Sequence, residues 1–293
     1  MIVAIVDVGS NTARLLVAVR RGKQLSTLRE DKAYLALGAD IERNGRISRA
    51  KLSETETVTR RFAEIARKLG ADAVDVIVTA PGRQTSEPDA LVDTLAQATR
   101  APVRVLSAEE EGLLAYEGAL ARTGSTLESI AVCDVGGGST EIVVGAPPSA
   151  PTWIRSVDLG ALRLTARTLE SDPPRKRELQ AATEEAQRCL EGIVPPRPNA
   201  GLAVGGSARA LAKLVGPRLG ERELRKALGL ATARRAAKVA KAYGLDEERA
   251  RVLPAGAIIL TEVTLRLGVP LQLARGGLRE GAALALLAQA AAA

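Results

Sequence analysis

The chain has 293 residues, of which 46% are apolar and only 2% aromatic, so any core must be aliphatic and can belong to one large domain or two ordinary ones. The absence of histidine excludes histidine-based catalytic triads and histidine metal sites, which leaves carboxylates, lysines or water for acid–base chemistry. The net charge of +7 favours an anionic partner, whereas the scarcity of aromatic residues argues against nucleic acid bound by base stacking.

The first 120 residues alternate between apolar runs of strand length and amphipathic segments of helix length. Strands are predicted at 2–6, 15–19, near 25–37, 74–78 and 103–106, and helices at 50–69 and 88–99. Ser107 is expected to cap a further helix, with Glu110 at the capping-box position. Three strands followed by alternating helices and strands are typical of an α/β layer.

The same order restarts near residue 130. Strands are predicted at 130–133, 142–145, 152–157, 202–204 and 271–274, and helices at 160–169, 175–192, 207–214, 221–228, 232–243, 247–267 and 278–291. A cut near Gly124-Ser125 therefore predicts two domains, residues 1–124 and 125–293.

Three sequence features bear on where in the cell the protein is located. The sequence enters an apolar strand directly, without the pattern of a cleavable leader, and charges interrupt its longest apolar runs, so no membrane span is expected. Cys133 and Cys189 form neither a CxxC site nor a disulfide framework. We expect a cytoplasmic protein.

The restart is an internal repeat. Residues 3–17 align without gaps on residues 130–144, and both copies read strand, Asp-Val-Gly, small polar residues, strand. Glycine lets phosphate oxygens approach the backbone N–H groups of such a turn, and Ser10, Asn11 and Ser139 add side-chain donors. An aspartate at the end of each first strand, Asp7 and Asp134, could hold a divalent metal or its water. The repeat predicts two hairpins that clamp a phosphate with its metal across a cleft; tight turns without a ligand are the alternative.

Other candidates are less specific individually. The Gly205-Gly206-Ser207 turn between a strand and a helix offers N–H groups to an anion. Arg14 and Arg83 could bind phosphate or serve as ordinary surface arginines. One carboxylate of the run 109–111 could act as a base, while the others complement the helix dipole. The basic stretch 222–241 is either solvated or follows a long polyanion.

At this point the motifs resemble a known family. They are Asp7-Val-Gly-Ser-Asn-Thr-Ala-Arg14, Ser107-Ala-Glu-Glu-Glu111-Gly, Asp134-Val-Gly-Gly-Gly-Ser-Thr-Glu141, Asp158-Leu-Gly-Ala-Leu-Arg163, Val204-Gly-Gly-Ser207 and Gly277-Leu-Arg-Glu-Gly281. In this order they resemble the exopolyphosphatase/guanosine pentaphosphate phosphatase (Ppx/GppA) family, in a short form without the C-terminal HD-like module. The resemblance implies two ribonuclease-H-like domains of the actin-like ATPase fold around a central cleft, and a homodimer.

The resemblance also implies roles for particular residues. Glu111 would position the nucleophilic water, and Asp134 and Glu141 would serve Mg²⁺, with Mn²⁺ as the alternative. The phosphate-binding residues would be Asp7, Ser10, Asn11, Arg14, Arg83, Gly136, Gly137, Gly138, Ser139, Gly205, Gly206 and Ser207.

Four functions are compatible with these residues. The first is an exopolyphosphatase that removes terminal phosphate from inorganic polyphosphate; the second is a guanosine pentaphosphate (pppGpp) 5′-phosphohydrolase using the same site. The third is an actin-like ATPase or sugar kinase, which the fold permits, since fold alone does not settle function. The fourth is a non-catalytic polyphosphate sensor.

Overall fold

The computed structural model describes residues 1–22, 24–121 and 128–292, which form two compact units. Unit 1 comprises residues 1–122 and 276–293, and unit 2 comprises residues 123–275. The predicted boundary at Gly124-Ser125 lies outside the described residues. The predicted second domain, 125–293, differs from unit 2 in its last helix, because that helix packs on the strands of unit 1.

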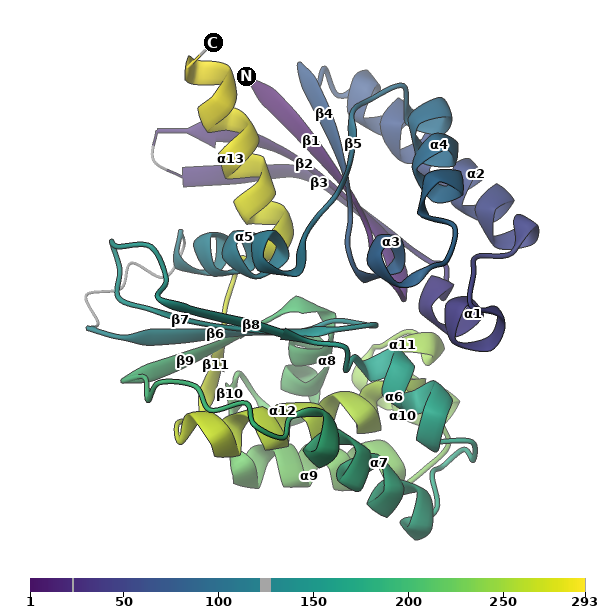
Figure 1. Cartoon of the computed structure of the whole chain (residues 1–293), viewed down its shortest axis with the longest axis vertical. Helices are drawn as coiled ribbons and strands as arrows, with labels where there is room; N and C mark the ends of the chain where they lie inside the picture. Colours follow the sequence, from purple (N-terminus) through teal and green to yellow (C-terminus); the bar gives the residue numbers. More distant parts are fainter. Residues whose placement is uncertain (23, 122–127, 293) are drawn as a thin grey trace. The chain divides into compact units, whose positions relative to one another are not determined.

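Unit 1 is a five-stranded sheet with helices on both faces (Figure 1). Its strands are β1 (Ile2–Val8), β2 (Thr12–Arg21), β3 (Gln24–Tyr34), β4 (Ala73–Val78) and β5 (Val103–Val105). Its helices are α1 (Leu37–Asn44), α2 (Arg49–Lys68), α3 (Ala80–Gln84), α4 (Pro88–Thr99), α5 (Ala108–Leu120) and α13 (Leu278–Ala292). The strand order is β3-β2-β1-β4-β5, antiparallel up to β1 and parallel from β1 to β5.

Both faces of this sheet are buried. Along β1, Ala4 and Val6 belong to the core cluster that includes Phe62 of α2, whereas Val3 and Ile5 belong to a second cluster with residues of α13. Two buried faces explain why residues 2–6 read as a continuous apolar run and not as an alternating one.

Glycines allow α5 and α13 to approach at backbone distance. A Cβ on Gly118 would lie 2.0 Å from the carbonyl oxygen of Gly277, and a Cβ on Gly281 would lie 1.9 Å from that of Leu114. The Glu280 carboxylate accepts a hydrogen bond from the Gly277 N–H at 3.0 Å, and the buried Arg279 reaches Glu30 of β3 at 3.1 Å. The Gly277–Gly281 motif therefore docks the last helix on unit 1.

Unit 2 repeats the arrangement with one extra edge strand. Its strands are β6 (Ile130–Val135), β7 (Thr140–Gly145), β8 (Trp153–Val157), β9 (Ala200–Val204), β10 (Arg218–Leu219) and β11 (Leu271–Leu273). Its helices are α6 (Ala161–Thr168), α7 (Lys176–Cys189), α8 (Gly205–Val215), α9 (Glu221–Thr232), α10 (Ala236–Tyr243), α11 (Glu247–Arg251) and α12 (Leu253–Leu267). The order β10-β11-β9-β6-β7-β8 matches unit 1 strand for strand, apart from β10.

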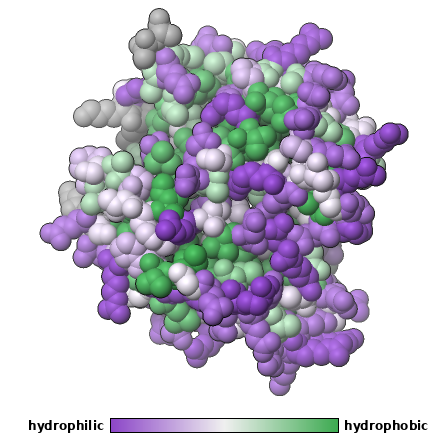
Figure 2. All heavy atoms as spheres, viewed as in Figure 1, coloured by the Kyte–Doolittle hydropathy of each residue, from purple (hydrophilic) through white to green (hydrophobic). Residues whose placement is uncertain are grey.

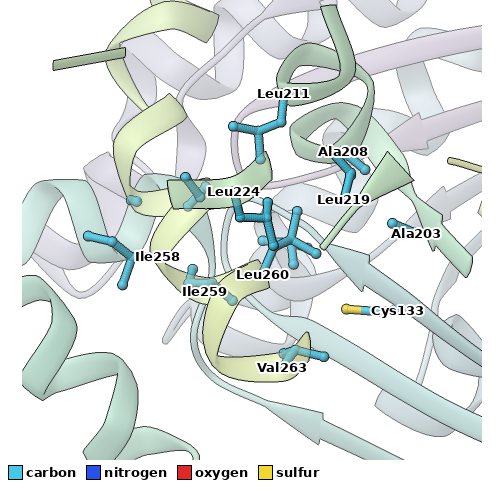
Figure 3. Close-up of a cluster of buried hydrophobic side chains, with 14 of the residues drawn as sticks. Cys133, Ala203, Ala208, Leu211, Leu219, Leu224, Ile258, Ile259, Leu260 and Val263 are labelled. Atoms are coloured by element: carbon cyan, nitrogen blue, oxygen red, sulfur yellow. The ribbon is translucent and has the colours of Figure 1, made fainter. Parts of the chain in front are cut away.

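The core of unit 2 is aliphatic, as the composition predicts. Helix α12 is buried along most of its length and packs Leu260 and Val263 near Cys133 of β6 (Figure 3). Burial raises the pKa of the Cys133 thiol well above its ordinary value, and the nearby carboxylates of Asp134 and Glu141 add to the effect. Cys133 is therefore a structural thiol.

Most predicted elements are confirmed, but one predicted helix is divided and three short elements were not predicted. The predicted helix 247–267 divides into α11 and α12 at Val252, because Pro254 has no N–H group to continue the ladder. Helices α1 and α3 and strand β10 were not predicted. Among the described residues, no helix offers an apolar stretch of the length that a membrane span needs. Figure 2 shows hydrophilic residues mainly around the rim of this face, with hydrophobic patches between them.

Candidate functional site

The two hairpins of the repeat have the same register and the same turn hydrogen bond. Gly9 donates its N–H to the carbonyl of Thr12 at 3.0 Å, and Gly136 donates to Ser139 at 3.0 Å. Asp7 faces Arg14 across the first pair of strands as Asp134 faces Glu141 across the second. The predicted gapless repeat is confirmed.

In unit 1 the segment leading into α1 holds the turn carbonyls. The N–H of Gly38 donates to the carbonyl of Ser10 at 2.8 Å, and the N–H of Leu35 donates to that of Asn11 at 3.0 Å. The start of α6 does the same in unit 2, where Leu162 and Arg163 both donate to the carbonyl of Gly137 at 3.0 Å. Because C=O and N–H point in opposite directions in a trans peptide, the N–H groups of these turn peptides face away from the helix starts.

The predicted first phosphate turn carries buried polar side chains. Ser10 is 3% exposed and Asn11 is 6% exposed. Their Oγ and Nδ2 atoms are buried, with no hydrogen-bond partner within the part of the chain that the structure describes. A buried donor left without an acceptor costs about 1–3 kcal/mol, which makes these two atoms candidates for binding an acceptor such as a phosphate oxygen.

The two hairpins differ in charge. Directly opposite residues of antiparallel strands project from the same face with Cβ atoms about 5 Å apart. The second hairpin therefore presents two carboxylates together, Asp134 and the 1%-exposed Glu141, while the first presents Asp7 with Arg14. Glu141 Oε1 accepts a hydrogen bond from Ser156 of β8 at 2.8 Å, which fixes that carboxylate. The second hairpin is thus the one suited to a cation.

The Gly205-Gly206-Ser207 turn lies against this acidic pair. Gly205 has φ +82°, and a Cβ there would lie 2.1 Å from Oδ1 of Asp134. Ser207, in the first turn of α8, is 1% exposed, and its Oγ has no hydrogen-bond partner among the described residues. The structure therefore brings Asp134, Glu141 and the third glycine turn together, as parallel pairing of β6 with β9 requires.

Arg249 is a positively charged residue beside the third glycine turn that was not among the candidates predicted from the sequence. Its guanidinium lies so close to the turn that a Cβ on Gly206 would be 2.8 Å from Nη2. It comes from the short helix α11, more than forty residues along the chain from the turn. No local motif marks it, because its place depends on the packing of α11 beside α8.

Glu111 lies in unit 1 at the start of α5. Its side chain is 9% exposed, and Oε2 is 2.9 Å from Nη2 of Arg83, whose Nη1 donates to the carbonyl of Leu106 at 2.9 Å. The structure therefore brings two predicted residues, Glu111 and Arg83, into one ion pair. Glu110 completes the predicted capping box with Ser107, which confirms the dipole-and-cap interpretation for that residue.

The remaining family-like motif supports the second hairpin. A Cβ on Gly160 would lie 2.3 Å from the Gly137 carbonyl, so only glycine allows α6 to start against the turn. Thr140 Oγ1 donates to the carbonyl of Leu159, and Arg163 is 3.4 Å from Asp158. The Asp158–Arg163 motif thus supports the turn and its peptide orientation.

The fold defines a class: a two-unit α/β protein of the actin-like ATPase fold, in which each ribonuclease-H-like unit carries the same glycine-rich hairpin at corresponding strands of its sheet. The model of the Ppx/GppA phosphatase family matches residues 15–290. The chain belongs to this family.

Known relatives agree with that assignment. Exopolyphosphatase 2 of Mycobacterium tuberculosis is 31% identical over 199 residues, covering 64% of this chain and 61% of the relative, so the match spans under two thirds of that protein. The crystal structure of the Aquifex aeolicus Ppx/GppA family member superposes with a TM-score of 0.81 at 23% identity, covering 99% of this chain and 98% of that one. An exopolyphosphatase from Cytophaga hutchinsonii gives 0.88 at 20% identity, covering 99% and 98%. These structures show the shared fold.

Proposed function

We propose that the protein is an exopolyphosphatase, which hydrolyses the terminal phosphate of inorganic polyphosphate. The observation that carries the proposal is the pair of carboxylates, Asp134 and Glu141, fixed beside two glycine-rich turns in a chain of this family. The name of the M. tuberculosis relative and the net charge of +7 favour polyphosphate over a nucleotide.

The acidic pair fits a magnesium ion. Mg²⁺ prefers oxygen ligands and is usually held by one or two carboxylates together with water and substrate phosphates. No group of three His, Cys, Asp or Glu side chains suited to a metal occurs in the described ranges, so two carboxylates are what the protein would contribute. When bound there, Mg²⁺ would offset the charge on phosphate oxygens. Mn²⁺ shares this ligand preference.

Protein groups would perform the remaining work by position and charge. The donors of Ser10 and Asn11, the Gly136–Ser139 turn and the start of α8 with Ser207 would bind phosphate oxygens. Glu111, oriented by Arg83, would accept a hydrogen bond from the attacking water and then its proton, since no histidine is present. Arg249 would add positive charge at the third turn.

The substrate is tested by orthophosphate release from long-chain polyphosphate and from pppGpp, measured in parallel with and without Mg²⁺. We expect faster Mg²⁺-dependent release from polyphosphate. Faster release from pppGpp would replace the proposed substrate, and tight polyphosphate binding without release would indicate a sensor. A cytoplasmic location and a homodimer stay predictions.

A further inference from the structure

A groove of about 580 Å³ lies between the start of α9 and the end of α12. Arg218, Arg222 and Arg225 line one part of it. Leu265, which is 53% exposed, Val269 and Pro270 line another. The groove therefore combines guanidinium groups with an apolar wall, in the size range of small-molecule sites.

The groove lies at the amino ends of the parallel strands of the unit 2 sheet, and the proposed phosphate turns lie at their carboxyl ends. Those turns follow the carboxyl ends of β6 and β9, whereas residues 268–270 of the groove precede the parallel strand β11. Arg218 lies in β10, which pairs with β11 in the antiparallel sense. A ligand here would occupy a site separate from the turns, whether or not the proposed hydrolysis is correct.

The arginines of the groove form ion pairs that a bound anion could replace. Glu223 is 3.0 Å from Arg218 and 3.1 Å from Arg222, and Glu221 is 2.6 Å from Arg225. The three arginines exceed the two glutamates by one positive charge. All three arginine side chains are at least 60% exposed, and such surface ion pairs are weak, so a bound anion can compete for the guanidinium groups.

Thr264 lines the same groove and carries an unused hydrogen-bond donor. This groove residue is 6% exposed, yet its buried hydroxyl has no hydrogen-bond partner among the described residues. Helical threonines elsewhere in the structure donate to the carbonyl four residues earlier, as Thr261 does to Ala257 in the same helix at 2.8 Å. Thr264 lacks that bond, so no acceptor among the described residues already holds its hydroxyl proton.

We propose that this groove binds a small organic anion that joins a phosphate or carboxylate to an apolar body. The anionic group would pair with Arg222 and Arg225 and accept from Thr264, while the apolar body would cover Leu265. A polyphosphate chain lacks the apolar part, so the groove is not an extension of the substrate site.

Calorimetric titration of the full chain with phenyl phosphate, phenylacetate and inorganic phosphate tests the proposal. We expect one saturable site for at least one of the aromatic anions, and which one binds identifies the anionic group. This site should survive Ser207→Ala, which alters only the third turn, and should be lost in Arg222→Gln/Arg225→Gln.

Thr264 provides the sharper test. Thr264→Val should weaken binding about five- to tenfold, the effect of one lost hydrogen bond, without lowering the unfolding midpoint, since it removes a buried hydroxyl that has no partner. Thr264→Ser keeps the hydroxyl and should bind within twofold of wild type. Absence of binding by both aromatic anions, or equal binding by wild type, Thr264→Val and the double arginine variant, would overturn the proposal.

Discussion

The contact between Gly205 and Asp134 allows the proposed metal position to be tested without touching a carboxylate. In Gly205→Ala the new Cβ would lie 2.1 Å from Asp134 Oδ1. Carbon and oxygen need more than 3 Å, so the carboxylate must move by about 1 Å. Displacements of this size can lower catalytic rates by about 10²-fold.

The same substitution also strains the backbone, because Gly205 has φ +82°. An L-residue in that region costs about 1–2 kcal/mol of stability. Gly244→Ala is the matched control: its φ of +59° imposes a similar cost, but nothing lies within 4 Å of its Cβ. The difference between the two variants isolates the displacement of Asp134.

Urea unfolding and orthophosphate release at a series of Mg²⁺ concentrations would be measured on both variants. We expect both to lose about 1–2 kcal/mol of unfolding free energy, and only Gly205→Ala to lose activity and require more Mg²⁺. Wild-type activity and Mg²⁺ dependence in Gly205→Ala would refute the assignment of Asp134 to the metal.

Three further predictions concern the scaffold. Gly118→Ala should lower the unfolding free energy by about 1–3 kcal/mol, because its Cβ would meet a carbonyl oxygen just before α13 at 2.0 Å, whereas Gly229→Ala, with open space around it, should raise it by about 0.5–1 kcal/mol; equal effects in urea unfolding would contradict this packing. Hydrogen bonds from the backbone N–H of Ser107 and then from its hydroxyl lower the pKa of Glu110 below its ordinary value. Glu110→Gln should therefore lower the unfolding free energy at neutral pH, and this difference from wild type should vanish as the pH falls through the lowered pKa. A difference that persists in acid would argue against the cap. A thiol reagent should label Cys189 in the native protein and Cys133 only after unfolding, since Cys133 is fully buried; rapid native labelling of both would show that β6 is accessible.

The α/β class was predictable from the sequence, because the strands appear as continuous apolar runs and the helices show a clear 3.6-residue spacing of apolar positions. Residues 2–6 and the two Asp-Val-Gly turns carry their information locally, so the repeat, its register and the hairpins follow from the chain alone. The last helix was assigned to the wrong unit by chain order, because its docking depends on Gly118, distant in sequence.

The candidate site also combines features that the local sequence predicts with features that depend on tertiary packing. Asp134 and the glycine turns are recognisable from the repeat, whereas the role of Glu141 is implied by the family resemblance. The ion pair of Arg83 with Glu111 was not predicted. Arg249 and the support from α6 depend on tertiary packing, so no local pattern predicts them. The helix break at Val252 was recoverable from Pro254, whereas the short helices α1 and α3 carry little periodicity.

Orthophosphate release from long-chain polyphosphate by wild type and Glu111→Gln, in the presence of Mg²⁺, tests the central claim most directly. Glutamine keeps the shape of the side chain but cannot take the proton of the attacking water. We predict release by the wild type and a loss of at least about 10²-fold in the variant. Release at the wild-type rate by Glu111→Gln would contradict the account.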